Sequence, residues 1–356
     1  MHADMDCFFA ACEVKNNPEL RKKPIVIGAD PKNGKGRGVV STCSYEARKF
    51  GISSGMPISQ AYKLNPKAVF LPVNFALYYE VSERIMKILR SYANKFQQIS
   101  VDEAYLDITE KSGDFADAKI LALKIKNEIY EKEKLTCSIG IASNKLIAKI
   151  ASEFNKPDSI TIIEEKNNKK FLENLDVRKL YGVGPKTEEK LKKLGIDTIG
   201  QLADFNKEKL IGIFGVYGLY LNLSANGIGD DFVAEEYERL SIGREMTFEH
   251  DIEDFDLIST AIDEIAEEIY SELKEGSYLY KTVSIKVRLH DFKTFTRAKT
   301  LNYLINDKKT IVNIAKALFQ EFAGNKIRLI GIRVSNLEEF KKQMTLQNYI
   351  VPDFNY

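Results

Sequence analysis

Short runs of apolar residues, bounded by polar or glycine-rich segments, recur along the first half of the chain. The runs at residues 2–6, 99–108 and 135–141 have the length and apolar content of buried strands. Residues 75–92 and 116–132 place their apolar residues at helical spacing instead. Strands and helices mixed in this way predict an α+β sheet that is covered by helices.

The segments between and after these elements have patterns of their own. Residues 8–73 form a compact insert between the first two strands, and Ser143 is a preferred N-cap for a helix reaching about Phe154. Residues 164–230 contain short helical patterns separated by glycines. The polar segment 231–240 is typical of a linker.

A second alternation of strands and helices begins at residue 241. Strand patterns cover residues 241–248, 281–289, 294–300 and 328–335, and helical patterns cover 255–275 and 308–323. This order is βαββαβ, a split-βαβ arrangement. The whole chain is therefore predicted to be a multidomain α+β protein.

Composition narrows the class of protein without identifying a partner. A length of 356 residues, 44% hydrophobic and 29% charged, indicates a soluble protein of several domains. A net charge of +1 gives no sign of nucleic-acid binding by the chain as a whole. The four scattered cysteines and three histidines argue against a zinc site and fit a reducing compartment. Since there is no membrane-spanning apolar run and no signal peptide, the expected location is the cytoplasm.

Carboxylates in apolar surroundings are the strongest candidates for chemistry. Asp102 and Glu103 stand together beside Ile99 and Val101, which are expected to bury the segment. Burying ionised carboxylates is costly unless a positive group meets them. If two strands bring Asp4 beside this pair, three hard oxygen ligands converge, as Mg²⁺ and two-metal phosphoryl transfer require. The alternative is an Asp-Glu pair on a solvated turn. Asp6 and Asp107 are weaker candidates that would orient a neighbour.

Cationic and phenolic side chains offer a complementary phosphate site. Tyr45 and Arg48 are three residues apart on a predicted helix and share a face. A phenol and a guanidinium on one face suit a triphosphate, and Lys156 is a further candidate. The alternative is an ordinary amphipathic helix.

Two segments suit the backbone of DNA. The glycine-rich turn with Gly182, Gly184 and Lys186 is similar to a helix-hairpin-helix motif, whose main-chain N–H groups bind phosphate. Residues 245–275 hold twelve acidic residues and one basic, whereas 281–333 hold twelve basic residues and three acidic. Alternation along the strand predicts an exposed sheet face with unpaired basic residues, which suits phosphates. The residues concerned are Lys286, Arg288 and Arg333. The alternatives are a glycine-containing connector and a solvated sheet face.

The C-terminal segment 341–356 is similar to a sliding-clamp-binding peptide. The residues that carry this similarity are Gln343, Leu346, Tyr349 and Ile350. Short patterns of this kind also arise by chance, but this one follows the last predicted domain.

Together these motifs resemble the Y-family, or lesion-bypass, DNA polymerases of the DNA polymerase IV branch. The strongest pieces are Asp4–Ala10, Ser44–Gly51, Ser100–Asp107 and the Gly182-Val183-Gly184 turn. Four such motifs in this order are highly specific, and the similarity extends over nearly the whole chain.

The resemblance implies a right-hand polymerase. A ferredoxin-like palm would comprise 1–7 and 74–163, small fingers 8–73 and a helical helix-hairpin-helix thumb 164–230. Segment 231–240 would link these to a βαββαβ little finger at 241–340.

The resemblance also assigns roles to single residues. Asp4, Asp102 and Glu103 would be catalytic and, with the Met5 carbonyl, would hold two Mg²⁺ ions. Tyr45, Arg48 and Lys156 would bind the triphosphate, and Phe9 would be the steric gate against ribonucleotides. Strand alternation would place Phe8 and Phe9 on opposite faces.

The implied function is low-fidelity, template-directed translesion DNA synthesis without a proofreading exonuclease. The implied partners are primer-template DNA, an incoming dNTP and a sliding clamp, and the protein is expected to be a monomer with no membrane contact. Two alternatives remain: a palm-fold nucleotide cyclase and a catalytically inactive DNA-binding scaffold. A cyclase does not need the hairpin glycines or the basic sheet, and a scaffold does not need the carboxylates.

Overall fold

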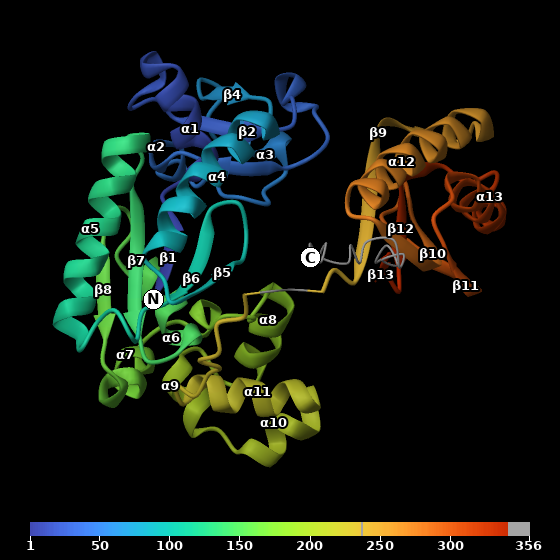
Figure 1. Cartoon of the computed structure of the whole chain (residues 1–356). Coiled ribbons are helices and arrows are strands. Elements are labelled where there is room, and N and C mark those ends of the chain that lie inside the picture. Colours follow the sequence, from blue (N-terminus) through green and yellow to red (C-terminus); the bar gives the residue numbers. More distant parts are fainter. Residues whose placement is uncertain (236–237, 341–356) are drawn as a thin grey trace, which may run out of the picture. The chain divides into compact units, whose positions relative to one another are not determined.

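The structure is a computed structural model, and it describes residues 1–235 and 238–340 (Figure 1). It divides into two compact units, which meet in sequence between Tyr237 and Glu238. No helix in the described ranges is long and apolar enough to cross a membrane.

The first unit contains a five-stranded sheet of order β5-β6-β1-β7-β8. β1 lies in its centre and pairs antiparallel with both neighbours, whereas β8 runs parallel to β7. The strands are β1 His2–Met5, β5 Lys95–Gln98, β6 Glu103–Asp107, β7 Cys137–Ala142 and β8 Ile160–Ile163. The order β5-β6-β1-β7 is the ferredoxin-like arrangement that was expected for this part of the chain.

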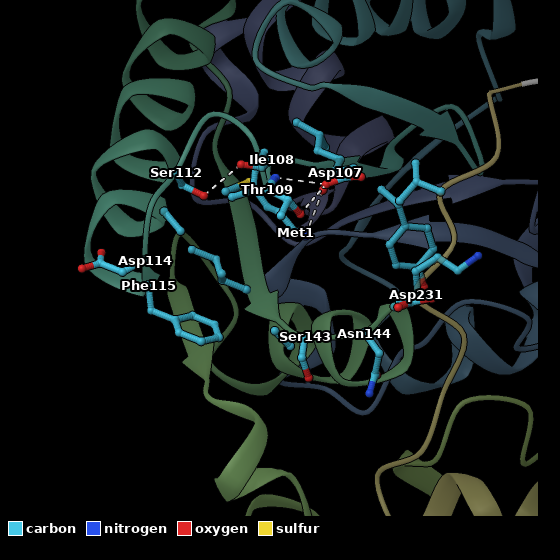
Figure 2. Close-up of a pocket in the computed structure, with 17 residues that line it drawn as sticks. Met1, Asp107, Ile108, Thr109, Ser112, Asp114, Phe115, Ser143, Asn144 and Asp231 are labelled. Carbon is cyan, nitrogen blue, oxygen red and sulfur yellow. Dashed lines mark hydrogen bonds between the residues drawn. The ribbon is translucent and has the colours of Figure 1, made fainter.

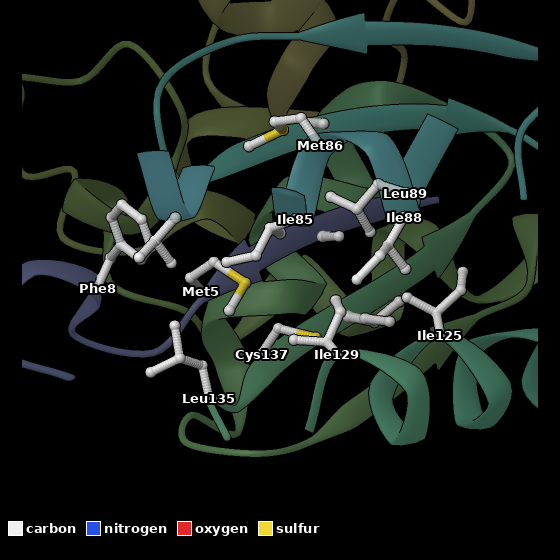
Figure 3. Packing of buried hydrophobic residues seen from close by; sticks show 14 of the residues in the cluster. Met5, Phe8, Ile85, Met86, Ile88, Leu89, Ile125, Ile129, Leu135 and Cys137 are labelled. Carbon is white, nitrogen blue, oxygen red and sulfur yellow. The ribbon is translucent and has the colours of Figure 1, made fainter. Parts of the chain in front are cut away.

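Helices cover both faces of this sheet. α4 Phe75–Ser91 and α5 Phe115–Glu133 contribute to a hydrophobic core with the inward residues of β1, β6 and β7 (Figure 3). α6 Lys145–Phe154 packs so closely on β7 that a Cβ at Gly140 would meet the carbonyl oxygen of Ala148 at 1.9 Å. α6 begins after Asn144, whose side chain accepts a hydrogen bond from Ile147 N (3.0 Å). The N-cap is therefore Asn144 and not Ser143.

The insert between β1 and α4 has its own three-stranded sheet and a small hydrophobic core. Its sheet order is β3-β2-β4, with β2 central. Its elements are α1 Phe8–Asn16, β2 Ile25–Gly28, β3 Val40–Cys43, α2 Tyr45–Arg48, α3 Ile58–Leu64 and β4 Val69–Leu71, with 3₁₀ turns at Pro18–Leu20 and Lys32–Gly34.

The rest of the first unit is helical, and its core includes the apolar face of α6. Its helices are α7 Asn168–Glu173, α8 Pro185–Lys193, α9 Ile199–Asp204, α10 Lys207–Phe214 and α11 Val216–Ala225, with 3₁₀ turns at Glu165–Asn167 and Val177–Lys179. Beyond α11 the chain still packs on this unit: Val233 is buried and Ala234 N donates to Gln97 Oε1 (3.3 Å).

The second unit has the expected βαββαβ order and a sheet of order β11-β10-β12-β9. Its helices pack on the apolar face of the sheet and leave the other face exposed. The elements are β9 Ser241–Ile252, α12 Phe255–Glu275, β10 Tyr278–Leu289, β11 Thr294–Ile305, α13 Lys308–Phe319, a 3₁₀ turn Gln320–Phe322, β12 Ile327–Ser335 and β13 Glu338–Glu339, which pairs with β10.

Candidate active site

Asp4, Asp102 and Glu103 lie around the point where the end of β1 pairs with the start of β6. Asp4 lies directly opposite Glu103 in the antiparallel register, so both side chains project from one face of the sheet. The Met5 amide donates to the Asp102 carbonyl oxygen (3.0 Å), which holds Asp102 beside the end of β1. The sheet thus brings together residues that are almost a hundred positions apart in the sequence.

The local setting of Asp102 differs from the sequence expectation. β5 ends at Gln98 and β6 begins at Glu103, so Asp102 belongs to the turn between two strands and not to one long strand. Ile99 is 39% exposed in this turn, so it does not bury the segment. The turn is stabilised locally, because Ser100 Oγ donates to Asp102 Oδ1 (2.5 Å).

Lysines neutralise two of the three carboxylates. Lys156 Nζ lies 2.5 Å from Asp4 Oδ1, and Lys149 forms an ion pair with Glu103. Burial raises the pKa of Asp4 to about 6, with further repulsion from Asp102 and Glu103, although Lys156 opposes the shift. Burial of the Asp4 carboxyl is therefore the main reason for its raised pKa, and Lys156 offsets only part of the effect.

Glu103 is held in the ionised form. Burial would raise its pKa, but contacts with His2 and Lys149 outweigh burial and lower the pKa to about 2. His2 is the first residue of β1, and its buried side chain faces α6 with Nδ1 2.8 Å from Ser152 Oγ. Burial lowers the pKa of His2 to about 4. Sequence patterns alone did not identify Lys149 or His2 as residues of the site. Lys149 could have been noticed because it is a lysine on a helix, α6, whose other faces are mostly apolar.

One pocket of about 240 Å³ is lined by six of the eight residues predicted to bind metal or nucleotide. Its lining includes Asp4, Met5, Phe9, Arg48, Asp102 and Lys156, together with Cys7, Phe8, Ser41, Thr42, Ser54 and Val101. Two predicted residues, Tyr45 and Glu103, are not part of this lining. Because the pocket joins carboxylates to cationic groups, it suits a ligand that carries both a metal and phosphates.

Tyr45 and Arg48 are placed by the short helix α2. Ser44 caps this helix, since its Oγ accepts from Ala47 N (3.3 Å). The Arg48 guanidinium lies over the Tyr45 ring, 4.6 Å from its centroid. The Tyr45 hydroxyl reaches Asp6 Oδ1 (3.4 Å). The expected shared face is present, and stacking holds the guanidinium at the pocket wall.

Asp6 has a structural environment. It accepts hydrogen bonds from Thr136 Oγ1, Ser138 Oγ and Asp158 N, each at 2.8 Å. Because protein groups already donate three hydrogen bonds to this carboxylate, Asp6 has a structural role. This agrees with the prediction that Asp6 orients a neighbour and is not itself a main catalytic candidate. That neighbour is Tyr45.

Phe9 lies on helix α1 and not on a strand. β1 ends at Met5, and Cys7 adopts a left-handed conformation (φ 38°) just before the helix begins. Strand alternation therefore does not explain how Phe8 and Phe9 differ. Phe8 is 3% exposed in the core, whereas Phe9 is half-buried and stacks on Tyr78 of α4.

The donor set fits a divalent cation, although the side chains do not form a closed site as they stand. Within residues 1–235 and 238–340 no three His, Cys, Asp or Glu side chains are close enough to hold a metal. Glu103 instead accepts from Lys149, and Asp4 from Lys156. The side chains of Asp4, Asp102 and Glu103 offer carboxylate oxygens, the hard ligands that divalent cations prefer. Burial, with a smaller contribution from Asp102 and Glu103, raises the pKa of Asp4, and a bound cation would favour its ionised form.

A larger pocket of about 360 Å³ lies elsewhere on the same sheet, among β6, β7 and α5 (Figure 2). Asp107 lies there, and its Oδ1 accepts from Thr109 N (3.0 Å) and Thr109 Oγ1 (2.7 Å). Neither Asp4 nor Asp102 lines this pocket. Asp107 therefore does not belong to the carboxylate group.

The hairpin residues are exposed in the helical part of the first unit. Gly182 has φ +93° and its carbonyl accepts from Tyr217 Oη (2.8 Å), while Gly184 caps α8 and Lys186 is exposed. Later lysines of α8 are paired with glutamates of the same helix. The positive charge of this helix is therefore smaller than its lysine content suggests.

The exposed face of the second sheet carries the expected basic residues. Arg333 pairs in register with Ser284, and Lys286 and Arg288 follow on the same face of β10. The expectation of unpaired charges is wrong for Lys286, which binds both carboxylate oxygens of Glu245 (2.8 and 2.9 Å). The sequence did not reveal this contact because Glu245 lies on β9, two strands away.

The predicted clamp-binding residues Gln343, Leu346, Tyr349 and Ile350 lie outside the described residues.

Comparison with known proteins gives matches over most of the chain. Residues 3–153 match the impB/mucB/samB family, residues 166–196 the helix-hairpin-helix motif of that family and residues 239–346 its C-terminal domain. The chain is 46% identical over 346 residues to DNA polymerase IV 2 of Methanosarcina mazei, which covers 97% of this chain and 94% of that protein. It is 42% identical over 341 residues to DNA polymerase IV of Clostridium perfringens, at 95% and 94% coverage.

Solved structures show the same similarity. A Y-family DNA polymerase chimera of Dbh and Dpo4 superposes with a TM-score of 0.85 at 31% identity, covering 95% of this chain and 98% of that one. An insertion ternary complex of Dbh DNA polymerase gives a TM-score of 0.68, also at 31% identity and the same coverage.

Proposed function

The chain belongs to the impB/mucB/samB family of Y-family DNA polymerases, and we propose that its translesion DNA synthesis takes place in the pocket between β1, α2 and the turn before β6. It is a DNA-directed DNA polymerase of the DNA polymerase IV branch. Membership of this family favours a DNA polymerase over the two alternatives, a nucleotide cyclase and an inactive DNA-binding scaffold. The observation that carries the assignment of the site is the shared pocket of Asp4, Asp102, Arg48, Lys156 and Phe9.

Polymerases of this family depend on metal ions, and we propose Mg²⁺ as the metal of this chain. Asp4, Asp102 and Glu103 would hold two ions with the carbonyl oxygen of Met5. When bound, such ions lower the pKa of the primer 3′-hydroxyl and neutralise the leaving pyrophosphate. The side chains that now pair with the carboxylates, Lys149 and Lys156, would give up these contacts.

The triphosphate would lie between the carboxylates and α2. Arg48 lines the pocket and Lys156 stands beside Asp4, so both cations can approach the phosphates as negative charge moves towards the leaving group. The Tyr45 hydroxyl would shift from Asp6 to a phosphate oxygen or stay in place and fix Arg48. Phe9 would lie against the sugar and exclude a 2′-hydroxyl.

The domain roles follow the same proposal. The palm would be 1–7 and 74–163, the fingers 8–73, the thumb 164–230, the linker 231–240 and the little finger 241–340. The small fingers would leave an open site that tolerates a damaged template base.

Primer-template DNA and an incoming dNTP are proposed as the substrates. Dbh DNA polymerase, a similar protein, was solved as an insertion ternary complex. Gly182, Gly184 and Lys186 would contact the phosphates of one strand, and Lys286, Arg288 and Arg333 those of another segment. Segment 341–356 would bind a sliding clamp, and the protein would act as a monomer in the cytoplasm.

Primer extension with Mg²⁺ tests the assignment of the carboxylates. Asp102→Ala or Glu103→Ala should abolish nucleotide addition while DNA binding survives, because other surfaces hold the backbone. Asp107→Ala is the matched control, since this carboxylate is near in sequence but bonded to Thr109 outside the pocket. Extension at near wild-type rate by either Asp102→Ala or Glu103→Ala would show that the metal assignment is wrong.

A further inference from the structure

Lys149 occupies a position between the candidate catalytic carboxylates and the hairpin turn. Its side chain, on α6, is only 13% exposed and forms an ion pair with Glu103. The same ammonium lies 5.6 Å from the centroid of the Tyr181 ring, in the turn that precedes α8. A single lysine therefore pairs with the carboxylate at the start of β6 that would hold metals and lies near the loop that would hold DNA.

Two pockets meet at this side chain. One, of about 350 Å³, is lined by Lys149, Arg178, Lys179 and residues 180–183 of the hairpin turn, with Glu153 as its acidic member. The other, of about 290 Å³, is lined by Lys149 and Tyr181 together with residues of β5, β6 and α11. Lys149 and Tyr181 are the residues that these two linings share.

The first pocket has more positive than negative charge available to a ligand. Arg178 Nη1 already donates to the Val183 carbonyl oxygen (2.7 Å), so this arginine supports the turn. The other cations of the lining are Lys179 and Lys149, and Lys149 becomes available to a ligand once its contact with Glu103 is released. A phosphate is the ligand that suits two lysines beside exposed main chain, because it accepts several charge-assisted hydrogen bonds.

The pair between Lys149 and Glu103 cannot persist unchanged when Glu103 binds a divalent cation. The cation would neutralise the carboxylate and repel the neighbouring ammonium. An ammonium that is largely buried then needs another acceptor. Lys149 lines the two pockets of about 350 and 290 Å³, and these offer the open space in which its ammonium can find that acceptor.

From this we propose that Lys149 binds a backbone phosphate of the primer strand near its 3′ end and pairs with Glu103 only while DNA and metal are absent. This inference rests on the proposed function, which places the metals at Glu103 and the DNA backbone at the hairpin turn. Lys149 is thus a positioning residue that exchanges one anionic partner for another.

The test combines two binding measurements on the full chain. Fluorescence anisotropy with a labelled primer-template measures affinity between 50 and 300 mM KCl, roughly the range in which phosphate contacts show their salt dependence. Manganese binding without DNA, measured by electron paramagnetic resonance, reports on the carboxylates. The variant is Lys149→Met, which keeps an unbranched side chain for packing, and the matched control is Lys132→Met on α5, whose lysine is 60% exposed and pairs with Glu128.

The two effects of Lys149→Met should have opposite signs. DNA binding should weaken about tenfold and the salt slope should fall by about 0.9, as expected for one lost phosphate contact. Manganese binding should become severalfold tighter, because the ammonium that competes for Glu103 is gone. Lys149→Arg keeps the charge and should retain the wild-type salt slope, which separates loss of charge from loss of packing.

Other outcomes overturn the inference. A salt slope for Lys149→Met equal to that of Lys132→Met, in a preparation whose wild type extends primers, shows that Lys149 does not bind DNA and leaves the polymerase assignment intact. Weaker binding of both manganese and DNA shows a merely structural role. A wild type that neither binds nor extends primer-template refutes the proposed function and this inference together.

Discussion

The rings of Phe9 and Tyr78 stack face to face, with centroids 4.1 Å apart and planes 11° from parallel. Phe9 is the second residue of helix α1 and lines the pocket, whereas Tyr78 is 1% exposed in the core on α4. The Tyr78 hydroxyl donates to Glu13 Oε1 (2.7 Å), which fixes the supporting ring. Phe9 is thus a wall of the pocket that rests on the core of the first unit.

We expect Phe9→Ala to raise ribonucleotide incorporation by orders of magnitude and to affect deoxynucleotide incorporation much less. A pocket that merely lacks a partner rejects an added hydroxyl by only about a hundredfold, so a stiff wall supplies the remaining selectivity. Single-nucleotide insertion of matched ribo- and deoxynucleotides on one template measures the ratio.

Tyr78→Leu should raise ribonucleotide incorporation by a smaller factor, because Phe9 stays in place but loses a stacking contact worth about 0.5–1.5 kcal/mol. Phe8→Ala is the comparison variant at the neighbouring residue, which is 3% exposed and lies mainly in the core although it also lines the pocket. An unchanged discrimination ratio for Phe9→Ala, or the same gain from Phe8→Ala, would contradict the assignment of Phe9.

Metal affinity should depend on pH through Asp4. Burial raises the pKa of Asp4 to about 6, and a metal binds only the ionised carboxylate. Affinity for Mn²⁺ should therefore be nearly constant above pH 7 and should fall about tenfold per pH unit below pH 6. Glu103 adds no slope there, because its pKa is about 2.

Calorimetric titration of the DNA-free protein at several pH values between 5 and 8 measures this dependence. An affinity that stays flat from pH 5 to 7 would show that Asp4 does not bind the metal.

The ion pair between Lys286 and Glu245 should weaken DNA binding. Glu245→Gln leaves the Lys286 ammonium without its carboxylate, so DNA should bind more tightly and the salt slope should steepen by up to about 0.9. Lys286→Ala together with Arg288→Ala should flatten the slope by roughly two phosphate contacts at most. Anisotropy titrations at several salt concentrations distinguish these outcomes, and slopes that match the wild type in all variants would place this sheet face away from DNA.

Deletion of residues 341–356 should leave distributive synthesis on a short primer intact. Only the rate stimulated by a sliding clamp should fall, because a tether raises the effective concentration of the enzyme at the primer end. The measurement is primer extension with and without a loaded clamp. Equal stimulation of the full-length and truncated proteins would rule out this segment as the tether.

Local patterns determined much of this protein. Helical and strand spacing predicted α4, α5 and the βαββαβ order of the second unit, because side-chain periodicity reports the buried face of each element. The motif around Asp102 and the short helix with Tyr45 and Arg48 also identified residues that the structure places around one pocket or in contact with its lining.

Only the tertiary structure decided which charges meet. The partners of Asp4, Glu103 and Lys286 come from other elements, so no local pattern reveals their ion pairs. Likewise, the turn at Asp102 and the helix at Phe9 depend on hydrogen bonds and packing across β1, β6 and α4. Sequence periodicity records which side of an element is apolar, whereas the electrostatics of a site depends on distances that arise when separate elements pack together.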